Sequence, residues 1–84
     1  MKILVLGATG MLGSTMFKQL FADERYSVWG TMRSPTALGS FSEAERENLV
    51  SNIDVLDSDQ LISIFSKIKP DVVINCVGLI KQLS

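Results

Sequence analysis

The chain has 84 residues, enough for one small domain, because a domain typically needs about 50–250 residues. Hydrophobic residues make up 46% of it and charged residues 20%, a composition typical of a folded protein with a packed core. The net charge is −1, without the basic excess of nucleic-acid-binding domains, so we expect no nucleic-acid partner.

The cysteine and histidine content narrows the location and the chemistry. Cys76 is the single cysteine and histidine is absent, so neither an internal disulfide nor a Cys/His metal site is expected. The apolar run at residues 3–6 ends at Gly7, well short of the ~7–15 apolar residues of a signal peptide. No run reaches the ~18 residues of a membrane span. The sequence therefore predicts a cytoplasmic protein with no metal and no membrane partner.

The first predicted elements are a strand and a helix. Residues 3–6 form an uninterrupted apolar run that ends at a glycine, as in a central parallel strand covered on both faces. Leu12, Met16 and Leu20 then recur at helical spacing. This spacing predicts an amphipathic helix that ends near Ala22.

A second strand and a mainly irregular connection follow. Residues 26–32 are aromatic and β-branched and lie between charged segments, which predicts a strand. Residues 34–48 are polar and contain proline and glycine, which predicts a loop. Ser42 and Glu45 have the spacing of a capping box, so we expect one short helix within that loop.

The third strand is predicted at residues 49–55, although polar residues interrupt it. A second amphipathic helix is predicted around residues 61–68. Its expected N-cap is Asp57 or Ser58, and Pro70 stops it.

A fourth strand is predicted at residues 71–77. Strands that alternate with helices in this way predict βαβ units and a parallel sheet. The expected fold is α/β, a partial doubly wound parallel sheet with strand order 3-2-1-4 and helices on both faces. In such sheets ligands bind at the carboxyl ends of the strands, where the strand order reverses beside the first strand.

Three glycines connect the first strand to the first helix. Gly7, Gly10 and Gly13 form a G-x-x-G-x-x-G pattern, which suits a tight turn, a close approach of phosphate to the backbone and close contact between helix and strand. The N–H groups of Met11 and Leu12 would face the phosphates of a dinucleotide. The alternative is a tight turn that binds no ligand.

Arg33 follows the second strand, where domains that prefer NAD place an acidic residue. A guanidinium group at this point suits charge-assisted hydrogen bonds to a 2′-phosphate. The expected cofactor is therefore NADP, with NAD possible. The alternative is a solvated loop cation.

Two further segments lie at the expected carboxyl edge. Asp54 and Val55 would close the third strand near the adenine ring, although an aspartate that ends a strand and helps to start the next turn fits about as well. Cys76, Val77 and Gly78 close the fourth strand, where small side chains allow a ribose to lie close. For Cys76 itself, packing is favoured over chemistry.

The segments MKILVLGATGMLG and PDVVINCVG together resemble the N-terminal Rossmann part of extended short-chain dehydrogenases/reductases, and most closely the dTDP-4-dehydrorhamnose reductase branch. Members reduce a keto group on a nucleotide-linked sugar with NADPH or NADH. The resemblance covers all 84 residues and implies a set of cofactor-binding positions. These are Gly7, Thr9, Gly10, Met11, Leu12, Gly13, Arg33, Asp54, Val55, Cys76, Val77 and Gly78.

The chain departs from that family in its catalytic residues. The family uses a Tyr-x-x-x-Lys pair, in which the tyrosine protonates the carbonyl and the lysine lowers the tyrosine pKa. The single tyrosine here is Tyr26, and Gly30 stands four positions later. We therefore expect residues 1–84 to be the incomplete, N-terminal part of an NAD(P)-binding domain, with catalysis and sugar binding in a longer parent protein.

Two other functions remain open. One is a non-catalytic NADP-binding redox sensor that interacts with another protein. The other is a structural module that forms a homo-oligomer through the exposed edge of the fourth strand, because an unpaired strand edge is a template for association.

Overall fold

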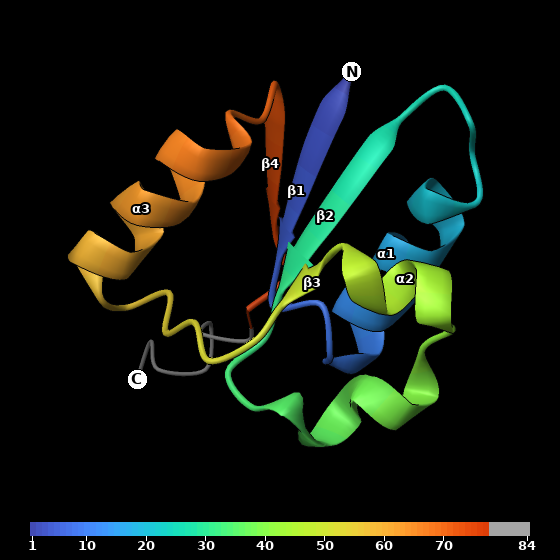
Figure 1. Cartoon of the computed structure of the whole chain (residues 1–84), viewed down its shortest axis with the longest axis horizontal. Coiled ribbons are helices and arrows are strands. Elements are labelled where there is room, and N and C mark those ends of the chain that lie inside the picture. Colours follow the sequence, from blue (N-terminus) through green and yellow to red (C-terminus); the bar gives the residue numbers. More distant parts are fainter. Residues whose placement is uncertain (78–84) are drawn as a thin grey trace.

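In a computed structural model of the chain, which describes residues 1–77, four parallel strands form one sheet. Their order is β3-β2-β1-β4, as the sequence predicts, with the first strand in the interior. Figure 1 shows the sheet between helix α3 on one side and helix α1 on the other. The strands are β1 (Lys2–Leu6), β2 (Ser27–Thr31), β3 (Leu49–Val50) and β4 (Val72–Asn75).

The helices connect consecutive strands. The two long helices, α1 (Met11–Phe21) and α3 (Ser58–Ile68), have eleven residues each. The connection between β2 and β3 holds a 3-10 helix, η1 (Pro35–Ser40), and the short helix α2 (Glu43–Glu47). Apart from η1, the much shorter third strand and shifts of one or two residues at other element ends, the observed order of elements confirms the predicted one. Among residues 1–77, no helix has the length and apolar character that a bilayer crossing requires.

Strand β1 is buried on both faces of the sheet. Ile3 and Val5 contribute to the hydrophobic cluster on the α1 side, and Leu4 and Leu6 contribute to the cluster on the α3 side. This division follows from the two-residue period of a strand. An unbroken apolar run is therefore the sequence that a strand in this position requires.

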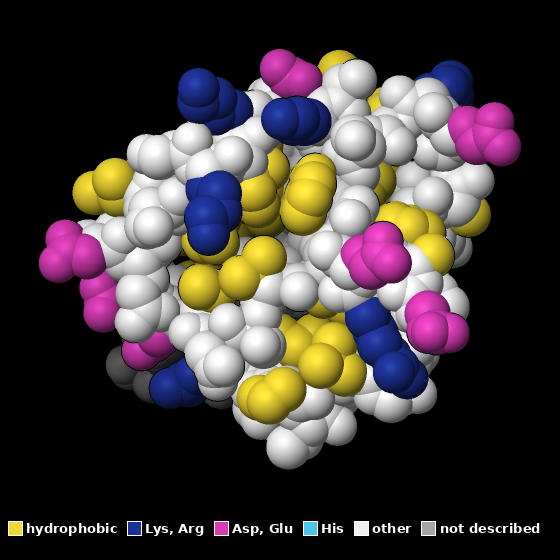
Figure 2. Space-filling view, in the orientation of Figure 1, with side chains coloured by type: hydrophobic (Ala, Val, Ile, Leu, Met, Phe, Trp, Pro, Cys, Tyr) yellow, Lys and Arg dark blue, Asp and Glu magenta, His cyan; other side chains and the backbone are white. Residues whose placement is uncertain are grey.

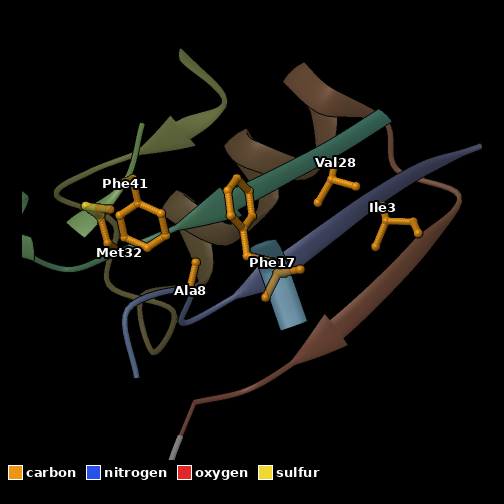
Figure 3. Packing of buried hydrophobic residues seen from close by; sticks show 7 residues of the cluster. Ile3, Ala8, Phe17, Val28, Met32 and Phe41 are labelled. Atoms are coloured by element: carbon orange, nitrogen blue, oxygen red, sulfur yellow. The ribbon is translucent and has the colours of Figure 1, made fainter. Parts of the chain in front are cut away.

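Phe17 anchors helix α1 to the sheet. Its side chain is fully buried, and Figure 3 shows it between the strands and Phe41. The Phe41 ring meets it edge-on, with ring centroids 5.8 Å apart. Burying one such side chain stabilises the fold by roughly 1.5–3 kcal/mol. Gly30 permits this contact, because a Cβ there would lie 2.9 Å from Ala8 Cβ and 3.1 Å from Phe17 Cδ1.

Helix α3 covers the opposite face with Ile64 and Ile68, which belong to the cluster on the α3 side. Its N-cap is Asp57, one of the two predicted residues. The helix ends at Lys69, which adopts the left-handed conformation (φ 53°) directly before Pro70. Proline disfavours the helical conformation in the residue before it, so this end follows from the sequence.

The short helix α2 begins as predicted. Ser42 Oγ accepts a hydrogen bond from the Glu45 N–H (3.2 Å), and Glu45 Oε1 accepts one from the Ser42 N–H (2.8 Å). Both halves of the capping box are therefore present.

The prediction of a third strand over residues 49–55 is wrong, because β3 contains only Leu49 and Val50. The Met32 N–H donates to the Val50 carbonyl, but the Met32 carbonyl accepts from Ile53 rather than from residue 52. Asn52 is the extra residue and has φ 62°, a left-handed conformation that asparagine tolerates. The chain therefore bulges out of the ladder immediately after β3.

The surface view in Figure 2 shows hydrophobic side chains gathered in the middle of one face, with charged side chains mainly toward its margin.

Strand β4 pairs with β1 along one edge, and within residues 1–77 no strand pairs with its other edge. Val72 and Val73 of β4 are each about two-fifths exposed.

Candidate functional site

A pocket of about 220 Å³ lies where the parallel strands end. Its walls come from the segments that follow β1, β2, β3 and β4, which meet at one edge of the sheet. This is the edge at which doubly wound sheets bind ligands. The lining residues are Gly7, Thr9, Gly10, Thr31, Met32, Arg33, Val55, Cys76 and Val77.

Each glycine of the loop after β1 has a different physical role. Gly7 has φ +76°, a backbone conformation that residues with a side chain rarely adopt. This conformation lets the chain turn out of β1. A Cβ on Gly13 would meet the Gly7 carbonyl oxygen in a severe clash, so helix α1 starts directly against the loop only because that Cβ is absent. Gly10 lines the pocket, and a Cβ on Gly10 would find no described atom within 4 Å, so its backbone is not crowded by the described residues.

Among the described residues, no side chain accepts a hydrogen bond from the free N–H groups in the first turn of α1. Gly10 is its N-cap, no side chain caps it within the described structure, and its first turn has no acidic residue. The side chains of Met11 and Leu12 are 91% and 64% exposed, so they leave the approach to the backbone open. Unpaired N–H groups and the helix dipole make such a terminus attractive to an anion such as a pyrophosphate.

Arg33 follows β2 and lines the pocket. Its side chain is exposed, whereas Met32 beside it is 2% exposed and forms part of the core. The single ion pair within residues 1–77 joins Arg25 and Asp23, so the described chain offers no carboxylate to Arg33. A cation therefore stands at the rim of the pocket with its charge available to a ligand.

Of the pair Asp54 and Val55, only Val55 lines the pocket. Because the chain bulges after β3, Asp54 lies in the turn before α3 and does not close a strand. Its Oδ1 accepts a hydrogen bond from the Leu56 N–H (2.9 Å), and its own N–H donates to Gln60 Oε1 (2.8 Å). Asp54 therefore organises a turn next to the pocket.

Cys76 and Val77, which follow β4, both line the pocket. The Cys76 N–H donates to the Leu6 carbonyl (2.9 Å), and the Cys76 side chain packs partly buried against the cluster on the α1 side. This placement agrees with a packing role for the thiol. The remaining predicted residue of this segment, Gly78, lies outside the described residues.

Sequence reasoning missed one lining residue, Thr31. Thr31 is 1% exposed, and its Oγ1 accepts a hydrogen bond from the Gly7 N–H (3.2 Å). The available signal was its position, because a hydroxyl residue at the carboxyl end of a buried strand lies at the edge where the glycine loop begins.

The perturbed titrations lie away from the pocket. The Arg25 side chain donates to the Asp23 carboxylate, and this hydrogen bond, with one from the Arg25 backbone N–H, lowers the pKa of Asp23 to about 2. The same contact raises the pKa of Arg25. Both residues precede β2, at the opposite edge of the sheet. Within residues 1–77, no group of three or more His, Cys, Asp or Glu side chains is placed to hold a metal ion.

The fold and the pocket agree with the comparison with protein families. The family model described as NAD dependent epimerase/dehydratase family matches residues 3–83, nearly the whole chain. No curated protein has a significant sequence match to the chain.

Proposed function

The chain belongs to the NAD-dependent epimerase/dehydratase family, and from that premise we propose that it is the NADP(H)-binding half of an oxidoreductase that reduces a keto group on a nucleotide-linked sugar. The family itself is NAD(P)-dependent and has a Rossmann-type domain, which agrees with the 3-2-1-4 sheet. The finer assignment to a reductase similar to dTDP-4-dehydrorhamnose reductase rests on the sequence resemblance.

One observation carries the binding proposal: Gly10, the N-cap of α1, has no side-chain cap among the described residues and lines the pocket beside β1, where the strand order reverses. In this proposal the cofactor pyrophosphate lies against Gly7, Thr9 and Gly10 and accepts hydrogen bonds from the N–H groups of Met11 and Leu12. Gly13 brings that helix close. The open space over Gly10 is where a phosphate would approach the backbone.

The remaining predicted residues divide between the two ends of the cofactor. Arg33 would bind the 2′-phosphate, and Asp54 and Val55 would lie beside the adenine ring. Cys76 and Val77, followed by Gly78, would border a ribose. When bound, the nicotinamide would supply or accept a hydride, and the chain would bind and orient it.

The choice of NADP over NAD is tested with Arg33→Ala. Dissociation constants for NADPH and NADH are measured by titration of the reduced cofactor's fluorescence. The substitution is expected to weaken NADPH binding by about tenfold and to change NADH binding little, because only NADPH carries the phosphate. Arg25→Ala, which removes the same charge at the opposite edge of the sheet, is the matched control. An equal loss for both cofactors would show that Arg33 does not read the 2′-phosphate.

Saturating NADPH is also expected to raise the melting temperature of the unsubstituted chain, because a ligand that binds only the folded state stabilises it. If neither NADPH nor NADH binds or raises the melting temperature, the proposed function is wrong.

A second candidate, a non-catalytic NADP-binding redox sensor, agrees with the position of Tyr26. This tyrosine precedes β2, at the edge of the sheet opposite to the pocket, and its ring lies 5.4 Å from the Arg25 guanidinium carbon. It is therefore not placed to protonate a substrate at the pocket. The intact mass of the natural gene product separates the two: a product near 30 kDa with a Tyr-x-x-x-Lys pair supports the reductase, whereas one of 9.2 kDa supports the sensor.

The proposals on partners and location are independent of the cofactor. A homo-oligomer through the outer edge of β4 is supported by the partial exposure of Val72 and Val73. Size-exclusion chromatography with light scattering tests it, and a monomer at high concentration would exclude it.

We place the protein in the cytoplasm because Cys76 is a free thiol, and subcellular fractionation tests that placement.

A further inference from the structure

Thr31 holds two consecutive peptide groups of the glycine loop. It is the last residue of β2, and its side chain is the single buried polar one within residues 1–77. Thr31 Oγ1 accepts a hydrogen bond from the Gly7 N–H (3.2 Å), and the Thr31 carbonyl accepts one from the Ala8 N–H (2.8 Å). One strand residue therefore fixes both N–H groups with which the chain leaves β1.

These two hydrogen bonds act on the two peptide groups that flank Gly7, which has φ +76°. The Gly7 carbonyl oxygen lies against the position that a Cβ of Gly13 would take, so a change in the orientation of the backbone at Gly7 displaces the start of α1. The backbone carbonyl that accepts from the Ala8 N–H is present whichever residue occupies position 31. The acceptor for the Gly7 N–H is a side-chain hydroxyl, so it depends on the residue type. Without the hydroxyl, that partly buried N–H loses its acceptor. An unsatisfied donor costs free energy, which favours loop conformations in which the Gly7 N–H reaches water.

A hydroxyl suits this position better than other acceptors. It is neutral, so it holds the Gly7 N–H without adding negative charge beside the uncapped start of α1, whereas a carboxylate would repel a phosphate there. Its own proton remains able to turn toward the pocket, which Thr31 lines.

We propose that Thr31 is a positioning residue for the cofactor site, acting through the Gly7 N–H to keep the glycine loop in its binding conformation. The inference rests on the proposed function for its ligand, but its structural half concerns the unliganded chain. When the loop is less often in the competent conformation, the apparent affinity falls by that fraction.

The test compares Thr31→Ser, Thr31→Val and Thr31→Ala. Serine keeps the hydroxyl and loses the methyl, valine keeps the shape and loses the hydroxyl, and alanine loses both. Two quantities are measured on the full 84-residue chain: the dissociation constant for NADPH, and the hydrogen-exchange rate of the Gly7 amide in the unliganded protein by NMR.

Valine and alanine are expected to weaken NADPH binding by about tenfold and to speed exchange of the Gly7 amide, while serine stays close to the unsubstituted chain in both. Serine and alanine are both expected to lower the melting temperature, because both remove a buried methyl group. A merely structural role would make affinity follow the melting temperature, so serine with lowered stability and intact affinity separates the two roles. If valine destabilises the chain too far to fold, the serine and alanine pair carries the comparison.

Valine with unchanged affinity and unchanged Gly7 exchange would overturn the inference. If the unsubstituted chain binds neither NADPH nor NADH, the proposed function fails and exchange decides the positioning role by itself. Faster Gly7 exchange in valine and alanine than in serine then supports it, and equal rates refute it.

Discussion

Helices α1 and α3 have the same length and begin at the same edge of the sheet, yet their first turns differ completely. At α3, Asp57 Oδ1 accepts hydrogen bonds from the N–H groups of Asp59 (3.0 Å) and Gln60 (3.4 Å). At α1 the N-cap is Gly10, and no described side chain plays this part. The first N–H groups of α3 therefore have a side-chain acceptor, whereas those of α1 have none among the described residues.

The third position of each helix extends the contrast. At α3 it is Gln60, whose side chain accepts the Asp54 N–H and donates to Asp57 Oδ2 (3.2 Å), tying the turn together. At α1 it is Gly13, which has no side chain and allows contact with the Gly7 carbonyl. A self-capped terminus gains stability, whereas an open one gains a binding surface. Under the proposed function, the open junction at α1 is the one that binds the cofactor.

The largest effect is expected from Gly13→Ala. The new Cβ would clash with backbone that cannot move aside without displacing Gly7, so we expect a loss of roughly 3 kcal/mol of stability. Urea unfolding followed by circular dichroism measures it. Gly39→Ala is the control, because a Cβ there meets no described atom within 4 Å and stability should hardly change. Equal stability for both variants would contradict the close contact between α1 and the loop.

The next effect comes from giving α1 the cap that α3 has. Gly10→Asp should raise the stability of the unliganded chain by about 0.5 kcal/mol, because an N-cap carboxylate satisfies free N–H groups and suits the helix dipole. The same charge should weaken NADPH binding by more than about tenfold through repulsion of the phosphates. Unfolding curves and cofactor titrations measure the two quantities.

The mirror-image control is Asp57→Ala at α3. It should cost about 1 kcal/mol of stability and leave NADPH affinity unchanged, because that terminus serves only the fold. If Gly10→Asp binds NADPH as tightly as the unsubstituted chain, the start of α1 is not the phosphate site.

The smallest effect concerns the opposite edge of the sheet. The pKa of Asp23 is lowered to about 2 by Arg25, so its contribution to stability is present above the ordinary aspartate pKa and is lost as the pH falls toward 2. Arg25→Gln should raise the pKa of Asp23 only partway, because the backbone N–H of residue 25 still donates to Asp23. NMR titration of the Asp23 carboxyl carbon measures it, and NADPH affinity should not change. An unshifted pKa would contradict the assigned cause.

Local patterns were sufficient to predict most of this fold. The apolar run of β1, the helical spacing in α1 and α3, and the capping signals at Ser42 and Asp57 each depend on residues near one another in sequence. Their alternation then leaves few topologies to consider. The strand order was predicted from the doubly wound topology and not from any long-range signal.

The errors arise where distant segments decide the outcome. The third strand ends early because Asn52 adds a residue to the pairing with β2, which shifts Asp54 into a turn. Thr31 was overlooked because its hydrogen bond reaches Gly7, 24 residues away. The glycine spacing indicated a pocket, but not which residue of the neighbouring strand supports its first turn.

The parallel arrangement of the strands also has a practical side. Met1 is 64% exposed and stands at the amino end of β1, and Figure 1 shows this end of the chain at the opposite end of the strands from the loop that follows β1. Its carbonyl accepts a hydrogen bond from the Ser27 N–H, a bond that does not involve the terminal amine. An affinity tag, a fluorescent dye or a surface tether joined ahead of Met1 would thus leave the mouth of the pocket unobstructed, and immobilised protein could be used directly for cofactor measurements.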